Sequence, residues 1–289
     1  MSTKRKQLLI LKYFDTSVAN ALGALQARSL PRPEAQMLLL HVLGQPTNAR
    51  AWLLAHDTDE LPGAAHARLH ELATRRLAGE PMAYLTGSKA FYGLQLQVDA
   101  RVLDPRDDTE TLVDWALALL LRDAGRRVLD LGTGSGAIAL ALAAERPRAR
   151  VTAVDASADA LAVAAGNAAR LGLELDLRHG DWFGPLADER FDLIVSNPPY
   201  IAADDPHLPA LSHEPRQALV SGADGLHDIR RIIAAAPEHL APGAWLLLEH
   251  GWDQAAAARA LLSDSGWAQV QSRRDLAGVE RCSGGQWPL

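Results

Sequence analysis

The sequence is poor in the features that build disulfides, metal clusters and membrane spans. Cys282 is the single cysteine among 289 residues, so an intrachain disulfide and a cysteine-based metal cluster are both excluded. The apolar run after Lys4–Lys6 stops at Leu11, which is too short for the apolar region of a secretory signal. No stretch approaches the ~20 apolar residues of a membrane-spanning helix. We therefore expect a soluble protein of the reducing cytoplasm, with no metal site and no contact with a membrane.

Positive charge is also scarce in the longer part of the chain. Residues 81–289 carry 19 Lys and Arg against 28 Asp and Glu, whereas residues 1–80 carry ten against seven, and the whole chain has a net charge of −6. Proteins that bind a phosphate backbone present a basic surface. Direct binding of DNA is therefore not expected, and the partner should be a protein or a small molecule.

The first 80 residues show helical signals and no strand signals. An apolar run opens near Pro33 and is stopped by Gly44, and Pro62-Gly63 precedes a second run with leucines near the i, i+3, i+4 spacing. At 289 residues the chain is long enough for two domains. We predict that residues 1–80 form a small helical bundle.

The pattern changes between residues 81 and 108. Phe91, Leu94, Leu96 and Val98 show period-two alternation around Gly93, which predicts a short hairpin. We interpret residues 81–108 as a structured linker between two domains.

Short apolar segments alternate with alanine-rich helical runs from residue 127 onward. This alternation predicts a mostly parallel sheet with helices on both faces, and therefore an α/β domain over residues 109–289. The expected strands are 128–131, 151–155, 175–178, 191–195 and 244–249.

A glycine-rich turn follows the first of these strands. Its residues are Gly132, Thr133, Gly134, Ser135 and Gly136. Glycine permits a tight turn and a close approach of a ligand to the backbone amides. The spacing G-x-G-x-G differs from the G-x-G-x-x-G of dinucleotide-binding enzymes. We interpret the turn as a ligand-binding loop, although a tight turn without a ligand could have the same sequence.

Acidic residues stand at the ends of the next two strands. Asp155 is placed where open α/β sheets bind ribose hydroxyls. It could instead cap the following helix, a role that Ser157 can fill equally well. Asp181 and Trp182 follow the third strand. A carboxylate and an aromatic ring there could receive and cover an adenine ring, while Trp182 could equally belong to the core.

The most informative motif is Asn197-Pro198-Pro199-Tyr200, directly after the fourth strand. Two prolines stiffen the loop and remove two amide donors. Carbonyl oxygens and the Asn197 side-chain oxygen then form a group of acceptors beside an aromatic ring, which suits a planar NH2 group and not an anion. We predict that all four residues bind the substrate and that Asn197, Pro198 and Tyr200 are catalytic.

Motifs along nearly the whole chain resemble those of the release factor glutamine methyltransferase family, class I methyltransferases that use S-adenosylmethionine (AdoMet). The glycine loop and Asn-Pro-Pro-Tyr are shared with many enzymes, but the full set is specific. It includes Gly79-Glu80-Pro81, Ala83-Tyr84-Leu85-Thr86-Gly87, Phe91-Tyr92-Gly93, Pro105-Arg106, Asp108-Thr109-Glu110, Glu214-Pro215, Gly222, Asp224-Gly225-Leu226 and Glu249-His250-Gly251.

The resemblance implies a five-helix N-terminal domain, a hairpin linker and a Rossmann-like catalytic domain with a seven-stranded mixed sheet. It implies methylation of the glutamine in the Gly-Gly-Gln motif of class 1 peptide chain release factors, in support of translation termination, with S-adenosylhomocysteine as the second product. By position, AdoMet would be held by Gly132, Gly134, Gly136, Asp155, Trp182 and Asn197, and we include Thr133, Ser135 and Asp181 in the same site.

Three other interpretations remain open. A sister enzyme that methylates a ribosomal protein has a linker closer to Pro-Arg-Ser-Pro than to the segment 105–110 found here. A DNA adenine methyltransferase shares Asn-Pro-Pro-Tyr but needs a basic recognition region. A nucleotide-binding assembly protein with a dead site would be free to lose Asn197. The chain also carries Gly284-Gly285-Gln286 near its end, which we interpret as a coincidence and not as a site of self-methylation.

Overall fold

The computed structural model describes residues 17–120 and 125–288, and the chain divides into two compact units. The first unit ends at Thr86 and the second begins at Gly87. Each unit has a hydrophobic core of its own. The Lys-rich first dozen residues lie outside the described residues.

The described part of the first unit is built from helices around a leucine-rich core, as predicted. Ser17 caps the first of them, because its hydroxyl accepts a hydrogen bond from the Asn20 amide at 3.3 Å. Leu38 and Leu72 are fully buried in the core. The helices are α2 (Val18–Ala27), α3 (Arg32–Val42), α4 (Arg50–Ala55), α5 (Gly63–Leu77) and α6 (Met82–Thr86).

The first unit continues beyond residue 80, where the sequence suggested a boundary. After Pro81 the chain enters the short helix α6, whose Leu85 is buried in the same core as Leu38. A helix of five residues shows too little periodicity to be recognised in a sequence. Burial of Leu85 is what attaches this segment to the helical unit.

The predicted hairpin is confirmed, and it belongs to the second unit. β1 (Ser88–Phe91) pairs antiparallel with β2 (Leu94–Gln97). The buried side chain of Asn167, on α9 (Ala158–Leu171), accepts from the Gln97 amide at 2.7 Å and donates to the Gln97 carbonyl at 3.0 Å. These two bonds fasten the hairpin to the larger unit.

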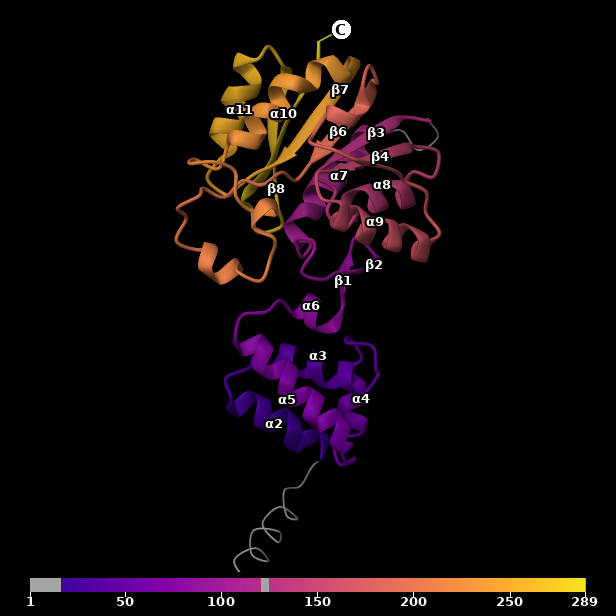
Figure 1. Ribbon diagram of the computed structural model, residues 1–289, viewed down its shortest axis with the longest axis vertical. Helices are drawn as coiled ribbons and strands as arrows, with labels where there is room; N and C mark the ends of the chain where they lie inside the picture. The colour runs from indigo at the N-terminus through magenta and orange to yellow at the C-terminus, as the bar shows by residue number, and fades with distance from the viewer. Residues whose placement is uncertain (1–16, 121–124, 289) are drawn as a thin grey trace, which may run out of the picture. The chain divides into compact units, whose positions relative to one another are not determined.

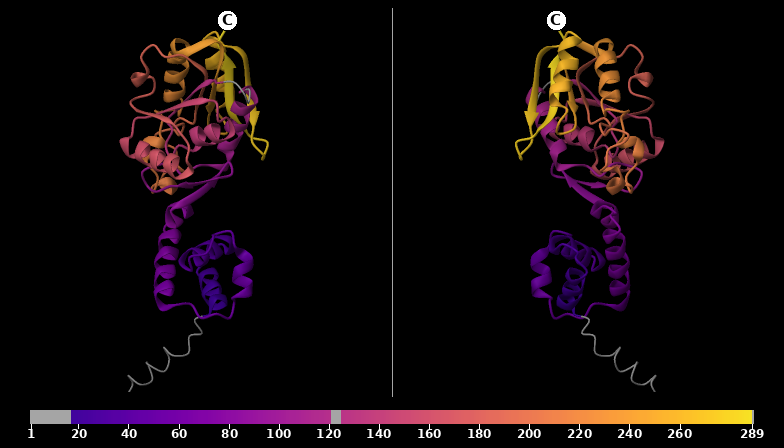
Figure 2. Two further views of the ribbon diagram at one scale, coloured as in Figure 1. Left: turned by 90° about the vertical axis from the view of Figure 1, so that its right-hand side faces the viewer. Right: turned by 90° about the vertical axis from the view of Figure 1, so that its left-hand side faces the viewer.

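A seven-stranded mixed sheet forms the centre of the second unit, which confirms the predicted α/β class. Its strand order is β5-β4-β3-β6-β7-β9-β8, with the first five strands parallel and the last two antiparallel to their neighbours. Helices cover both faces (Figure 1), and β8 lies at one edge (Figure 2). No described helix is long and apolar enough to span a membrane. The strands are β3 (Arg127–Leu131), β4 (Arg150–Asp155), β5 (Asp176–His179), β6 (Phe191–Ser196), β7 (Leu240–Glu249), β8 (Ala268–Arg274) and β9 (Glu280–Gln286), and the other helices are α7 (Glu110–Leu119), α8 (Ala137–Glu145), α10 (His227–Ala235) and α11 (Ala255–Asp264).

The Gly-Gly-Gln tripeptide near the end of the chain lies in β9. Gly284 and Gly285 pair with β7, and a Cβ added to Gly284 would come within 2.5 Å of the Leu246 carbonyl oxygen. The Gln286 side chain donates to the Gly243 carbonyl at 2.8 Å. The tripeptide therefore has a structural role in the sheet, which supports its interpretation as a coincidence.

Candidate active site

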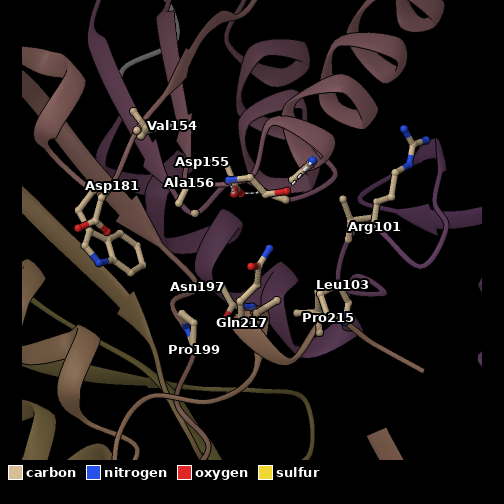
Figure 3. Close-up of a pocket in the computed structure, with 18 residues that line it drawn as sticks. Arg101, Leu103, Val154, Asp155, Ala156, Asp181, Asn197, Pro199, Pro215 and Gln217 are labelled. Atoms are coloured by element: carbon tan, nitrogen blue, oxygen red, sulfur yellow. Dashed lines mark hydrogen bonds between the residues drawn. The ribbon is translucent and has the colours of Figure 1, made fainter. Parts of the chain in front are cut away.

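A pocket opens at the carboxyl ends of β3, β4 and β6, where the strand order of the sheet reverses. Ligands of doubly wound sheets bind at such a reversal. Figure 3 shows Asp155 on one side of this pocket and Asn197 and Pro199 on the other. Of the predicted site residues, Gly132, Gly134, Asp155, Asp181, Trp182, Asn197 and Pro199 line it.

The glycine-rich loop has a backbone conformation that favours glycine. Gly132, Gly134 and Gly136 have φ angles of 72°, 55° and 83°, all in the left-handed region. A Cβ on Gly132 would touch the Trp182 ring at 3.4 Å, whereas a Cβ on Gly134 would meet no atom within 4 Å. The loop therefore depends on glycine for its path and leaves space for a ligand at Gly134.

Asp155 fixes the glycine loop through its carboxylate. Its Oδ2 accepts from the Gly134 amide and its Oδ1 from the Ser157 amide, both at 2.8 Å. The cap of α9 is Ser157, whose hydroxyl accepts from the Ala160 amide, so the alternative role of Asp155 as a helix cap is wrong. Burial raises the pKa of Asp155, and the two amide bonds lower it. Each carboxylate oxygen can still accept a second hydrogen bond from a ligand.

Asp130, Thr133 and Ser135 are buried and support the loop from within the unit. The Thr133 hydroxyl donates to Asp130 Oδ2 at 2.7 Å. Burial raises the pKa of Asp130 to about 7. Among the described residues, Thr133, Ser135 and Gly136 are not part of the pocket lining. Their contribution in this structure is to the shape of the loop.

Trp182 lies between the pocket and the core. It lines the pocket and also packs against the core of the second unit. Asp181 lines the pocket as well, but its Oδ2 accepts from the guanidinium of Arg231 on α10. Because Arg231 engages the Asp181 carboxylate, the Trp182 indole is the better candidate of the two to cover a planar ligand.

The Asn197 amide is held in one orientation by Thr109. Its Nδ2 donates to the Thr109 hydroxyl oxygen at 3.2 Å. Thr109 is 3% exposed and ends the short 3-10 helix η1 (Asp107–Thr109). The sequence offered Thr109 only as part of a family motif, without a role. With Nδ2 bound there, Oδ1 faces away from Thr109 and is available to a ligand.

A second pocket adjoins the first at Asn197. Leu103, Asn197 and Ala218 line both pockets, so the two share a wall. Tyr200 belongs to the second pocket, whose lining consists of Leu103, Arg106, Asn197, Tyr200, Ile201, Leu211, Ala218 and Leu219.

The Asn-Pro-Pro-Tyr loop divides its residues between these pockets and the interior. Pro199 lines the first pocket, whereas Pro198 is buried and lines neither. The Tyr200 hydroxyl donates to Oε1 of Glu249 at 3.4 Å, and burial raises its pKa well above the usual range. Tyr200 is therefore neutral and offers its ring, with the hydroxyl turned toward the interior.

Glu214 joins two segments that the sequence showed only as separate motifs. Its buried carboxylate accepts from the Arg106 guanidinium and from the Asp104 amide. These bonds fasten the segment after the hairpin to the loop after Tyr200. Arg106 lines the second pocket, and Pro215, which follows Glu214 in the chain, lines the first. The Arg106–Glu214 ion pair therefore shapes both pockets.

The side chain of Gln254 holds the backbone of Tyr200 in place. The Gln254 Nε2 donates to the Tyr200 carbonyl at 3.0 Å, and its Oε1 accepts from the Gly251 amide at 2.8 Å. Gly225, at a φ of 72°, lies so close that an added Cβ would be 2.2 Å from the Tyr200 carbonyl oxygen. The loop that carries Asn197 is therefore rigidly placed.

Comparison with known proteins first defines the class of the chain. Residues 109–224 match the model of the methyltransferase small domain, and residues 18–87 match that of the PrmC N-terminal domain. A solved methyltransferase from Pyrococcus furiosus has the same fold, with a TM-score of 0.53 over 75% of this chain and 98% of its own, at 20% identity. The fold and the matched domain define a class I methyltransferase.

Two relatives then define the family. The release factor glutamine methyltransferase of Bordetella pertussis is 57% identical over 259 residues, which cover 89% of this chain and 95% of the relative. The protein of the same description from Xylella fastidiosa (strain Temecula1) is 49% identical over 271 residues, which cover 93% and 98%. The chain belongs to the release factor glutamine methyltransferase family.

Proposed function

We propose that the enzyme uses AdoMet to methylate a glutamine side-chain nitrogen in the Gly-Gly-Gln motif of class 1 peptide chain release factors. The observation that supports this most strongly is the place of Asn197. It lines both adjoining pockets and turns its Oδ1 away from Thr109. One residue can therefore stand between a methyl donor in the first pocket and an amide nitrogen in the second.

The residues of the first pocket fit AdoMet. The open space at Gly134 admits a ligand to the loop backbone, Asp155 offers a carboxylate to ribose hydroxyls, and Trp182 offers an indole to the adenine. Bound AdoMet would supply a methyl group on a positively charged sulfur. Gly132 and Gly136 keep the loop in its left-handed path, and S-adenosylhomocysteine would occupy the same pocket after transfer.

The second pocket offers what a planar amide needs. We assign Asn197 Oδ1 as one acceptor for the amide hydrogens and the Tyr200 ring as the surface for the flat face of the amide. Pro198 lines neither pocket, so we assign its carbonyl as the second acceptor only because it follows Asn197 in the same loop. The Pro199 ring lies on the side of the first pocket. In this arrangement the substrate NH2 is held at the wall that the two pockets share.

An amide nitrogen is a poor nucleophile because its lone pair is delocalised into the carbonyl. Fixed acceptors hold the group so that the lone pair turns toward the methyl donor, and they stabilise positive charge as it develops on nitrogen. Loss of one such contact typically costs ~3–4 kcal/mol of transition-state stabilisation, and alignment adds an orientation effect. The proton leaves after transfer, so a histidine base is not required. Among the described residues, no histidine lines either pocket.

Incubation with labelled AdoMet tests the proposal. Purified release factors, ribosomal proteins and DNA are offered together, with a release factor whose Gly-Gly-Gln glutamine is changed to alanine as the matched control. We expect label on the release factor alone and none on the altered factor. Label on a ribosomal protein or on DNA would establish one of the alternative activities, and label on none of them would support a dead site.

A further inference from the structure

Glu249 is a buried carboxylate beside the site, and the chemistry proposed so far does not use it. It ends β7 and is 1% exposed. Its Oε1 accepts from the Tyr200 hydroxyl at 3.4 Å, and hydrogen bonding by the Thr109 hydroxyl lowers the pKa of the carboxylate. Within the described residues, its Oε2 makes no hydrogen bond. A buried carboxylate lowers the stability of the fold unless it is hydrogen-bonded, so its presence beside the site points to a functional role.

The direction of the hydrogen bonds around Glu249 is set by simple chemistry. An ionised carboxylate can only accept, so the Thr109 hydroxyl donates to it. The lone pairs of that hydroxyl then face Asn197, whose Nδ2 lies at 3.2 Å. Nδ2 is a donor and Oδ1 an acceptor, so this arrangement keeps Nδ2 toward Thr109 and Oδ1 away from it. The carboxylate thereby fixes which end of the Asn197 amide reaches the substrate.

We propose that Glu249 is a positioning residue that orients both polar members of the Asn-Pro-Pro-Tyr loop, Asn197 through Thr109 and Tyr200 directly. Asn197 is left to present its acceptor oxygen, and the Tyr200 hydroxyl is withdrawn toward the interior so that its ring faces the second pocket. This inference rests on the proposed function, because it needs a substrate nitrogen that donates hydrogen bonds.

The surroundings of Glu249 place its pKa near neutral pH. Burial raises its pKa to about 7, and the two hydroxyl bonds and Arg281 act in the opposite direction. Arg281 is shared with Asp108 at 3.1 Å, and Asp108 raises the pKa further. Cys282 on β9 pairs with Glu249 on β7. Burial raises the pKa of the Cys282 thiol well above the usual value, so the thiol stays neutral.

Protonation of Glu249 would remove the constraint that fixes the directions of the Thr109 hydroxyl and the Asn197 amide. A protonated carboxyl can donate to the Thr109 hydroxyl, which is then free to donate to Asn197 and to stabilise the opposite amide orientation. The ionised form is therefore the active one. The rate of methyl transfer should rise with pH through about 7, the value to which burial raises the pKa of Glu249.

Four variants test the inference: Glu249→Gln, Thr109→Val, Thr109→Ser and, as a carboxyl-to-amide control on the exposed end of α11, Asp264→Asn. Loss of a hydrogen bond to a charged group typically weakens the interaction that it supports about 10- to 150-fold. We expect a loss of this size in the single-turnover rate of Glu249→Gln and Thr109→Val at saturating AdoMet, with AdoMet affinity unchanged within about twofold. Thr109→Ser should recover most of the lost rate, and Asp264→Asn should match the wild type.

The pH profile separates this role from a merely structural one. The wild-type rate should rise through pH ~7, and the rise should be absent in Glu249→Gln. Wild-type rates in Glu249→Gln and Thr109→Val, no recovery in Thr109→Ser, or an unchanged pH profile would each overturn the inference. If Glu249→Gln does not fold, as a melting curve would show, the Thr109 pair decides the question.

A readout without substrate keeps this inference separate from the proposed function. In 15N-labelled enzyme, the side-chain NH2 signal of Asn197 can be assigned through its loss in Asn197→Ala. It should shift in both Glu249→Gln and Thr109→Val and stay in place in Asp264→Asn. A wild-type enzyme that leaves release factors unlabelled would contradict the proposed function, whereas an unmoved signal would contradict the positioning role of Glu249.

Discussion

The two units of this enzyme bury different kinds of side chain. In the described residues 17–86, Ser17 is the single buried polar residue, and the core is made mostly of leucine and alanine. The second unit buries the carboxylate of Asp275, between β8 and β9, and also those of Asp130, Glu214 and Glu249. Buried charges cost stability unless they are bonded. The second unit therefore carries polar groups that packing alone does not explain.

Asp130, Glu214 and Glu249 each hold a part of the site. Asp130 binds the Thr133 hydroxyl under the glycine loop, Glu214 binds Arg106 in the pocket wall, and Glu249 binds the Tyr200 hydroxyl. The interior of the second unit is thus organised around the pockets, whereas the interior of the first is organised around its own packing. The following tests break or sharpen this contrast.

The largest effect should come from removing residues 1–86. The residues of both pockets lie in the second unit, so AdoMet binding should remain. A glutamine on a loop gives the pockets little surface to hold, and a stable protein interface buries ~1,600 Å². We expect methylation of an intact release factor to fall roughly 1000-fold, as when docking weakens from micromolar to millimolar.

The matched substrate for this truncation is a short Gly-Gly-Gln peptide, which both forms should methylate alike. Calorimetric titration with AdoMet and a melting curve report whether the second unit is intact. Equal rates of full-length and truncated enzyme on the intact factor would show that the helical unit has no docking role. Loss of AdoMet binding or aggregation would show that it only covers the second unit.

Asn197→Ala should lower turnover about 100- to 1000-fold, the typical cost of losing one fixed contact to developing charge. AdoMet affinity should change far less, because the acceptor matters most in the transition state. Single-turnover methylation at saturating AdoMet separates the two quantities. Transfer at the wild-type rate would remove Asn197 from the proposed mechanism.

Asp155→Ala should weaken AdoMet binding about 10- to 150-fold, because hydrogen bonds to charged groups contribute roughly 1.5–3 kcal/mol. The variant also releases the Gly134 amide. Asp159→Ala, in the first turn of the same helix α9, is the control and should bind normally. Unchanged affinity in a folded Asp155 variant, measured by calorimetry, would exclude this residue from the site.

The smallest effect should be on the pH dependence of stability. The folded pKa of Asp130 is about 7, above its ordinary 3.8. Between these values the folded protein holds a proton that the unfolded chain has released, so the free energy of unfolding falls as pH rises from about 4 to about 7. Asp130→Asn should reduce that fall between about pH 4 and 7, as urea unfolding can measure. Part of the fall in unfolding free energy should remain in this variant, because the pKa of Glu249 is also about 7. An equal fall in variant and wild type would contradict the assignment.

Much of the fold could be predicted because its signals are local. The strand from 191 to 195 and the hairpin around Gly93 show the spacing of their own element, and both were found. β8 and β9 were missed as individual strands, since β8 is largely polar at the sheet edge and β9 is glycine-rich. β9 pairs with β7 and β8 pairs with β9, so their strand conformation comes from tertiary interactions.

By itself, the sequence determined the site residues that lie next to one another in the chain. The loop 132–136 and the motif 197–200 are read directly, because a turn and a stiffened acceptor loop need only neighbouring residues. The tertiary structure decided which partners fix those groups. Thr109 is 88 positions from Asn197 and Glu249 is 49 from Tyr200. A hydrogen bond needs its two atoms within about 3 Å and in the right direction, and only the folded sheet brings such distant residues together.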